Sequence, residues 1–245
     1  MSSCRLYLCA GGESAMRVRE EFSRYASVYG ESNIIQVKVA QKLIANTVTN
    51  PKRILDLGCG SGALYSLIDW ECERFIGVDF SQEMLTHHPK NPNLEVLLGD
   101  FNTPELFETL GRETFDRIYS ASALQWAEDL NSVFQAISGL NSPVSLAIFT
   151  SGTFKTLYET AGLLPILKSS EEIMEIANLH FNAQYEIVRY VLEFDSVREM
   201  FRYIKRSGVS GGRRVLDFAQ TKRLMETYPL TYLEFEVIFI TSEEN

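Results

Sequence analysis

The sequence is poor in the features that mark secreted, metal-binding or membrane proteins. It has four cysteines in 245 residues and no CxxC pair, so neither a disulfide framework nor a cysteine-rich zinc site is predicted. Its three histidines include no pair at ligand spacing, so we expect no metal. No apolar run reaches the roughly 18 residues that a membrane-spanning helix needs. We therefore expect a globular protein of the reducing cytoplasm.

Acidic residues outnumber basic ones, 32 against 23, which gives a formal net charge of -9. This excess of negative charge repels nucleic acids and anionic membranes, so we predict neither as a partner. The length suits one domain with a sizeable core. We assign residues 16–245 to that domain. Residues 1–15 are expected to form a loosely ordered N-terminal extension, because the helical pattern begins only at Met16.

Strand and helix patterns alternate along the first 150 residues. Two helices with a bend are expected within residues 16–48, where apolar residues recur every three or four positions. Apolar strands are then predicted within 53–62 and at 74–79, 94–100, 115–121 and 144–150, with helices at 63–69, after Ser81 and at 124–140. Near-continuous apolar strands that alternate with helices indicate a mostly parallel sheet covered on both faces. The predicted fold class is a doubly wound, Rossmann-like α/β domain.

The pattern changes after Thr150. We predict a helical insertion at 154–177 that lies over the carboxyl edge of the sheet and over the site formed there. A strand at 185–194, a helix at 196–206 and a last strand at 233–240 complete the chain.

A glycine-rich loop follows the first predicted strand, with Asp56, Gly58, Gly60 and Gly62 in the pattern DxGxGxG. Glycines at such a turn let the backbone come close to a ligand, and a helix that starts there offers free N–H groups. Many glycine turns only solve a packing problem, so the loop alone is a weak indication of binding.

Two further strand ends strengthen the prediction of a ligand site. Asp79 lies 21 residues after Gly58 at the end of the second strand, where a carboxylate can accept hydrogen bonds from both hydroxyls of a ribose. Asp100 and Phe101 end the third strand and offer an acceptor beside an aromatic face, which suits adenine. A single aspartate at a strand end often serves only as a helix cap. Three successive strand ends together predict an adenosine site.

The adenosine ligand can be a dinucleotide, because Gly58, Gly60 and Ala63 also satisfy the GxGxx(G/A) pattern. However, the tight GxGxG spacing after Asp56 resembles the first motif of the class I S-adenosylmethionine-dependent methyltransferases, and the Asp100–Phe101 pair resembles their adenine site. A carboxylate at position 56 also suits the ammonium group of an amino acid better than a pyrophosphate. The resemblance implies S-adenosyl-L-methionine as the cofactor and a seven-stranded sheet with an antiparallel C-terminal strand and a helical lid.

Four further segments narrow the resemblance. EFSRYASVYGESNIIQ (21–36), ALQWAEDL (123–130), FRYIKRSGVSGGRR (201–214) and YPLTYLEFEVIF (228–239) are similar to the malonyl-acyl-carrier-protein O-methyltransferases. What this resemblance implies is methyl transfer to the free carboxylate of malonyl-acyl carrier protein, which gives the methyl ester that enters biotin synthesis. The alternative is a methyltransferase acting on a small free carboxylic acid or another small molecule.

Residues with aromatic, amide or guanidinium side chains are the candidates for the acceptor end of the pocket. For catalysis we predict Tyr29, Gln125, Trp126 and Arg214, although Trp126 can equally be a core residue. Arg24, which we place in the cofactor-binding set, Arg213 or Arg214 is expected to hold a carboxylate in bidentate fashion, either that of the cofactor or that of the malonyl group. Phe80 and Ser120, beside the strand ends named above, complete the predicted cofactor-binding set.

A basic segment stands out in this acidic chain. Residues 198–223 contain eight basic and two acidic residues. Such a charge asymmetry would steer an acidic partner to one side of the protein, and the resemblance implies an acidic acyl carrier protein. A solvated helix face is the plainer interpretation. The predicted docking residues are Arg198, Arg202, Lys205, Arg206 and Arg213.

Overall fold

The computed structural model describes residues 33–206 and 218–242. The expected N-terminal extension, the first of the two expected N-terminal helices, and the predicted site residues Arg24, Tyr29, Arg213 and Arg214 lie outside these ranges. No helix within the described residues is both long enough and apolar enough to cross a membrane.

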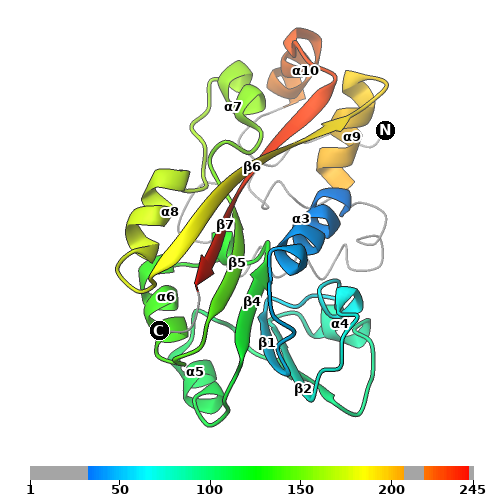
Figure 1. Cartoon of the computed structure of the whole chain (residues 1–245). Coiled ribbons are helices and arrows are strands. Elements are labelled where there is room, and N and C mark those ends of the chain that lie inside the picture. The colour runs from blue at the N-terminus through cyan, green and yellow to red at the C-terminus, as the bar shows by residue number, and fades with distance from the viewer. Residues whose placement is uncertain (1–32, 207–217, 243–245) are drawn as a thin grey trace.

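One mixed sheet of seven strands organises the chain (Figure 1). Its strands are β1 (Arg53–Leu57), β2 (Arg74–Asp79), β3 (Leu94–Leu98), β4 (Arg117–Ala121), β5 (Val144–Phe149), β6 (Ala183–Glu193) and β7 (Tyr232–Ser242), in the spatial order β3-β2-β1-β4-β5-β7-β6. Strands β1 to β5 pair in parallel, whereas β7 runs antiparallel to both β5 and β6. The sequence-based prediction of a mostly parallel sheet with an antiparallel last strand is confirmed.

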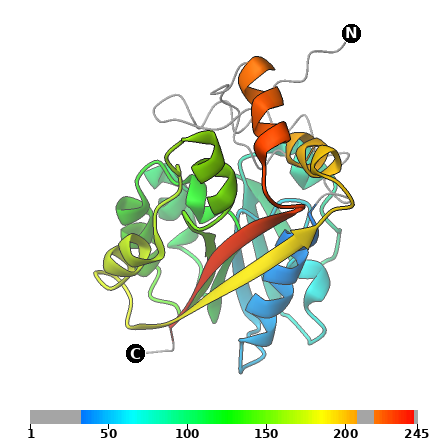
Figure 2. The same cartoon turned by 90° about the horizontal axis from the view of Figure 1, so that it is seen from above.

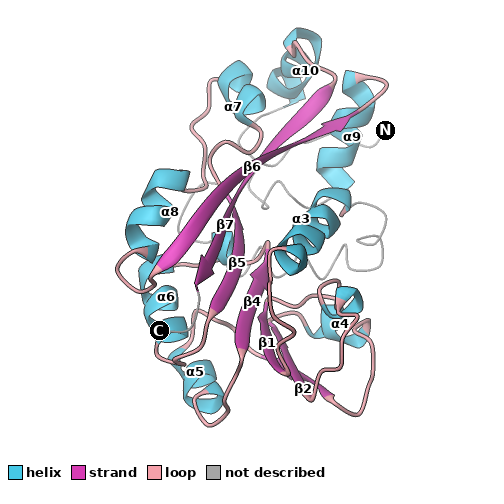
Figure 3. Ribbon diagram, viewed as in Figure 1, coloured by secondary structure: helices cyan, strands magenta, loops and turns pink. Residues whose placement is uncertain are grey.

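Helices cover both faces of this sheet (Figures 2 and 3). They are α3 (Ile34–Ala45), α4 (Gln82–Thr86), α5 (Pro104–Leu110), α6 (Leu130–Ser138), α7 (Lys155–Ala161), α8 (Ser170–Ala177), α9 (Val197–Arg206) and α10 (Phe218–Thr227). Two hydrophobic clusters form, one with α3, α9 and α10 and the other with α5, α6 and α8. Neighbouring strand residues divide between them, because successive side chains of a strand point to opposite faces. Ile54 and Val237 join the first cluster, and Leu55 and Ile238 join the second.

Helix α3 fixes the geometry of the site. It leads through a short connection to the first residue of β1, so its C-terminus lies near the amino edge of the sheet and its N-terminus near the carboxyl edge. Its apolar residues Ile35, Val39 and Leu43, spaced three or four apart, are fully buried against the sheet. This packing aims the start of α3 at the loops where a ligand of a parallel sheet binds.

Two helices were predicted too long. Residues 63–69 form turns and a single 3-10 turn, Tyr65–Leu67, rather than an α-helix. The indole of Trp70 donates to the carbonyl of Pro51, which returns the chain to the amino edge after one turn. The predicted helix at 124–140 is a 3-10 turn, Leu124–Trp126, followed by α6, because the carboxylate of Asp129 accepts from the N–H of Asn131 and starts a new helix there.

Residues 154–177 contain two helices rather than one continuous insertion. Helix α7 ends at Gly162, which adopts a left-handed conformation, and α8 starts at the capping box of Ser169 and Glu172. Helix α7 lies beside β7 and α10, while α8 packs against α6 and β6 on one face of the sheet.

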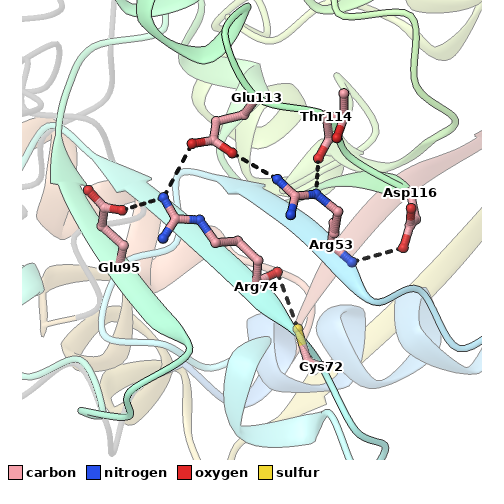
Figure 4. Close-up of polar contacts among 7 residues, drawn as sticks. All are labelled: Arg53, Cys72, Arg74, Glu95, Glu113, Thr114 and Asp116. Carbon is pink, nitrogen blue, oxygen red and sulfur yellow. Dashed lines mark hydrogen bonds and ion pairs between the residues drawn. The ribbon is translucent and has the colours of Figure 1, made fainter.

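Ion pairs close the amino edge of the sheet, at the opposite end from the glycine loop (Figure 4). Glu113 bridges two strands, with its carboxylate 2.9 Å from Nη2 of Arg53 on β1 and 3.3 Å from Nη2 of Arg74 on β2. Arg74 also pairs with Glu95 on β3 at 2.7 Å. Asp116 accepts from the backbone N–H of Arg53 at 2.9 Å. These pairs are partly exposed, so their contribution to stability is modest, and they fasten the first residues of the three strands together.

Candidate active site

A pocket opens at the carboxyl edge of the parallel strands. Its walls come from the start of α3, the glycine loop after β1, the ends of β2 and β4 and the turn after β3. These segments are far apart in the sequence and converge because β3, β2, β1 and β4 are adjacent in the sheet. Neither α7 nor α8 contributes a residue to the lining of this pocket.

The glycine loop is shaped by two glycines with different surroundings. Gly58 has φ +79°, and a Cβ built on it would lie 2.2 Å from the Cβ of Ala123, so only glycine fits this close approach of β1 to the segment after β4. Gly60 has φ +53°, and a Cβ there would meet no atom within 4 Å. Its Cα faces open space in the pocket, which leaves room for a ligand against the backbone.

Asp79 ties this loop to the end of β2. Its side chain is buried, and its two carboxylate oxygens accept from the backbone N–H groups of Gly60 at 2.9 Å and Ser81 at 2.8 Å. Burial raises the pKa of Asp79, and these two hydrogen bonds oppose the rise. Each oxygen keeps a further lone pair, so the carboxylate can still accept from two neighbouring hydroxyl groups.

Asp56 is the most unusual group in the pocket. It is 1% exposed, and its Oδ1 atom has no hydrogen-bond partner among the described residues. Burial, together with the negative charge of Asp79, raises the pKa of Asp56 to about 8. The side chain of Asp56 is therefore buried without a positively charged partner. A ligand that brings a cation to this position would stabilise its ionised form.

The aromatic residues after β2 and β3 form the next part of the wall. Phe80 and Phe101, both predicted to bind the cofactor, line the pocket. Asp100 does not line it: its Oδ1 accepts from the backbone N–H and the side-chain amide of Asn102. In the structure, this carboxylate shapes the turn that presents Phe101.

The segment after β4 supplies the opposite wall. Ser122 has φ +63°, which is strained for a residue with a side chain, and Gln125 donates to its carbonyl at 2.6 Å. Ser122 and Trp126 line the pocket, whereas Gln125 does not. The hydroxyl oxygen of Ser122 and Nε1 of Trp126 are buried without a hydrogen-bond partner in the part of the chain that the structure describes. Ser120 is placed differently, because its hydroxyl donates to the carbonyl of Leu57 and joins β4 to β1.

Helix α3 contributes residues that the sequence analysis did not assign. Asn33, Gln36 and Ala40 line the pocket from one face of the helix. Oε1 of Gln36 is buried and has no hydrogen-bond partner within the described ranges. Gln36 lies in a segment used above for the family resemblance, but its place in the same pocket as Asp56 depends on how α3 packs on the sheet. No local pattern reports that packing.

Comparison with known proteins assigns the chain to a family. Residues 55–149 match the family model of a methyltransferase domain. A malonyl-acyl-carrier-protein O-methyltransferase of Chlorobium phaeovibrioides is 30% identical over 224 residues, which cover 82% of this chain and 83% of that protein. The chain belongs to this methyltransferase family. A second such protein, from Chlorobium luteolum, is 25% identical over 95% of this chain and 94% of its own length.

Solved structures agree on the fold of this methyltransferase. A putative methyltransferase from Bacillus halodurans superposes with a TM-score of 0.61 at 10% identity, covering 84% of this chain and 99% of that one. A phosphoethanolamine N-methyltransferase of Haemonchus contortus, solved with S-adenosylhomocysteine, has a TM-score of 0.57 at 15% identity and covers 93% of this chain and 60% of that one.

S-adenosyl-L-methionine is the cofactor of this class I methyltransferase. The described pocket fits it. An aromatic wall, a carboxylate with free lone pairs and an unpartnered buried carboxylate stand in the order in which adenine, ribose and a positively charged amino acid follow one another in that molecule. The open space over Gly60 leaves room for the part of the cofactor that joins the ribose to the amino acid, against the backbone of the loop.

Proposed function

We propose that this methyltransferase transfers the methyl group of S-adenosylmethionine to the free carboxylate of a malonyl group carried by acyl carrier protein, which gives a methyl ester for biotin synthesis. The observation that carries the proposal is the extent of the likeness to the curated relatives. The methyltransferase domain model matches residues 55–149, whereas the Chlorobium luteolum relative aligns with 95% of the chain, including most of the residues on both sides of that domain.

The proposed cofactor contacts follow from the geometry of the pocket. We assign the ribose hydroxyls to Asp79, the adenine ring to Phe80 and Phe101, and the ammonium group to Asp56. Gly58 and Gly60 let the loop pass close to the cofactor, whereas Gly62 does not line the pocket: a Cβ on it would lie 2.6 Å from Cδ of Pro89. Asp100 and Ser120 support the walls of the site through Asn102 and Leu57.

The chemistry asks little of the protein beyond positioning. When bound, the cofactor supplies an electrophilic methyl group on a positively charged sulfur. A carboxylate acceptor is already ionised at neutral pH and needs no base. Accordingly, the described lining has no histidine, lysine or arginine, and its ionisable groups, Asp56, Cys59 and Asp79, belong to the cofactor end. The unlike charges of the reactants diminish in the transition state, so a dry site favours reaction.

Alignment of the two reactants is then the main source of rate. Holding them in line gains up to about 7 to 11 kcal/mol, because translational and rotational freedom has been given up on binding. We propose that Trp126 excludes water at the acceptor end of the described wall and that Gln125 holds the carbonyl of Ser122, which fixes the strained turn beside it. Tyr29, Arg24 and Arg214 keep their proposed roles at the acceptor and carboxylate positions.

Helix α9 is the proposed docking element for the carrier protein. Met200, Phe201 and Ile204 bury its inner face, while Arg198 and Arg202, one turn apart, are exposed on the other. Lys205, Arg206 and Arg213 extend this basic segment in the sequence. Acyl carrier proteins are acidic, so attraction to this face is the physical basis of the proposal.

The test supplies radiolabelled S-adenosylmethionine with malonyl-acyl carrier protein, malonyl-coenzyme A and free malonate in parallel. We expect label on the malonyl group of the carrier protein and none on acetyl-acyl carrier protein, the matched control that lacks a free carboxylate. Label that appears only on the small acids would contradict the proposal and establish the small-acid alternative.

A further inference from the structure

The start of α3 presents an unused set of hydrogen-bond donors to the pocket. The first intrahelical bond runs from the N–H of Val37 to the carbonyl of Asn33, so the N–H groups of the three preceding helical residues have no partner in the described structure. No acidic residue lies in the first turn, and the helix has 12 residues. Its N-terminus therefore carries a partial positive charge that nothing on its own element neutralises.

Two amide side chains add to these donors. Asn33 lies at the N-cap position, is 9% exposed and lines the pocket, yet its side chain makes no capping hydrogen bond. Gln36, one turn later, lines the same pocket, and its buried Oε1 atom has no partner within the described chain. Asparagine at an N-cap normally bonds to the backbone of its own helix, so an unpartnered one indicates that its amide serves another group.

Another part of the lining has the opposite electrostatic character. Asp56, the next-to-last residue of β1, lines the same pocket with a buried, unpartnered Oδ1 atom. The pocket thus has an acceptor pole at Asp56 and a donor pole at the start of α3. Because both poles line one pocket, a single ligand that satisfies both must carry a cation and an anion. The α-ammonium and α-carboxylate groups of an amino acid are attached to a single carbon and meet this requirement.

We propose that Asn33, Gln36 and the free N–H groups at the start of α3 bind the α-carboxylate of S-adenosylmethionine, while Asp56 binds its α-ammonium group. The amides donate through their NH₂ groups, and the helix N-terminus adds its backbone donors. The inference depends on the cofactor and not on the identity of the acceptor. It assigns the carboxylate of the cofactor to a neutral donor set in α3 rather than to Arg24, which leaves Arg24 for the carboxylate of the acceptor.

Decarboxylated S-adenosylmethionine is the discriminating probe, because it keeps the sulfonium and amino groups and lacks only the carboxylate. Isothermal titration should show that the unmodified protein binds S-adenosylmethionine at least about 10-fold more tightly than the decarboxylated compound, as expected when hydrogen bonds to a charged group are lost. The double substitution Asn33→Ala/Gln36→Leu should reduce this preference to about 3-fold or less. Gln36→Glu should reverse it, because a carboxylate placed there repels the cofactor's own carboxylate.

The matched control is Gln41→Leu, which removes an amide from an exposed position of the same helix. It should leave the preference unchanged, and thermal unfolding of each variant without ligand should confirm that α3 still folds. Equal affinity of the unmodified protein for the two compounds would overturn the inference. So would a preference that survives in a folded double variant. Since no acceptor is present, neither result bears on the carrier-protein proposal.

Discussion

At the scale of single residues, the pocket contains some polar groups that are held by hydrogen bonds and others that have no hydrogen-bond partner. Asp79 is held by two backbone N–H groups and keeps lone pairs for a ligand. Asp56, Gln36, Ser122 and Trp126 each bury a polar atom without a partner in the described structure. Buried polar groups are normally satisfied, so a cluster of unsatisfied ones around a single pocket indicates a ligand-binding site.

Replacing Asp79 by Asn should weaken cofactor binding without unfolding the protein. The amide keeps one acceptor oxygen but loses the charge and the second acceptor, so we expect the dissociation constant for S-adenosylmethionine to rise about 10- to 100-fold, as for hydrogen bonds to a charged group. Isothermal titration is the measurement. Asp116→Asn is the control, since Asp116 also accepts from two backbone N–H groups but lies at the amino edge. Equal affinity losses in the two variants would contradict the assignment of Asp79.

The two loop glycines should respond differently to an added methyl group. Gly58→Ala forces a Cβ within 2.2 Å of Ala123, so we expect a loss of about 2 kcal/mol or more in unfolding free energy. Adding Ala123→Gly should restore part of it, because the clashing atom is removed. Gly60→Ala meets open space and should cost about 1 kcal/mol through its positive φ while lowering cofactor affinity. Urea unfolding measures the first effect and titration the second; no rescue by Ala123→Gly would argue against the clash.

At the scale of elements, the parallel strands could be predicted and several helices could not. The apolar runs at 53–57 and 74–79 are buried on both faces, so their composition alone identifies them as strands. The helix expected at 63–69 is only one 3-10 turn. The reason is a hydrogen bond from the indole of Trp70 to the carbonyl of Pro51, 19 residues earlier in the sequence. Helix α5 was not predicted, although Pro104 at its first position and Thr103 before it are ordinary start signals.

The residues of the site likewise divide into those that the sequence predicts and those that it does not. Asp56, Asp79 and Phe101 could be predicted from a spacing rule, because parallel strands always bring their carboxyl ends to one edge. The role of Asn33 and Gln36 could not, because it requires knowing that α3 runs antiparallel to β1 and starts above the pocket. Asp100, predicted as a direct ligand, does not line the pocket; its Oδ1 accepts from the side-chain amide of Asn102 two residues later, which is the local turn chemistry of aspartate.

Helix α9 allows a test of docking at the level of one element. Reversing its charge with Arg198→Glu/Arg202→Glu should raise the KM for malonyl-acyl carrier protein about 3- to 10-fold, because an acidic partner is then repelled, and should leave the KM for malonyl-coenzyme A unchanged. The control pair Lys90→Glu/Arg112→Glu makes the same charge change at exposed positions outside α9. Equal changes for both acceptors, or equal effects of the two pairs, would remove the docking proposal.

At the scale of the whole molecule, the site and the stability of the fold are coupled through Asp56. Its pKa is about 8 in the folded protein, against 3.8 for an unperturbed aspartate, so the folded state holds a proton that the unfolded chain has released between these values. The free energy of unfolding should therefore fall as the pH rises toward about 8. Burial lowers the pKa of His88, which has the opposite effect on stability below about pH 6.5, so the clean window lies between about 6.5 and 8.

Urea unfolding across that window is the measurement. We expect the unmodified protein to lose stability with rising pH, and Asp56→Asn to show a flatter dependence because the titrating group is gone. Saturating S-adenosylmethionine should also flatten the curve, since its ammonium group favours the ionised carboxylate. A matched amide substitution at the exposed residue Glu108 should leave the slope as it was. An unchanged slope in Asp56→Asn would show that another group titrates.

The central claim is that the carboxyl ends of β1, β2 and β4, with the start of α3, enclose the cofactor. A crystal structure of the complex with S-adenosylhomocysteine tests it most directly. The account predicts ribose hydroxyls on the carboxylate of Asp79, adenine between Phe80 and Phe101, and the amino acid end between Asp56 and Asn33. Density for the ligand at another place, or this pocket filled by side chains while the ligand is bound elsewhere, would contradict the account.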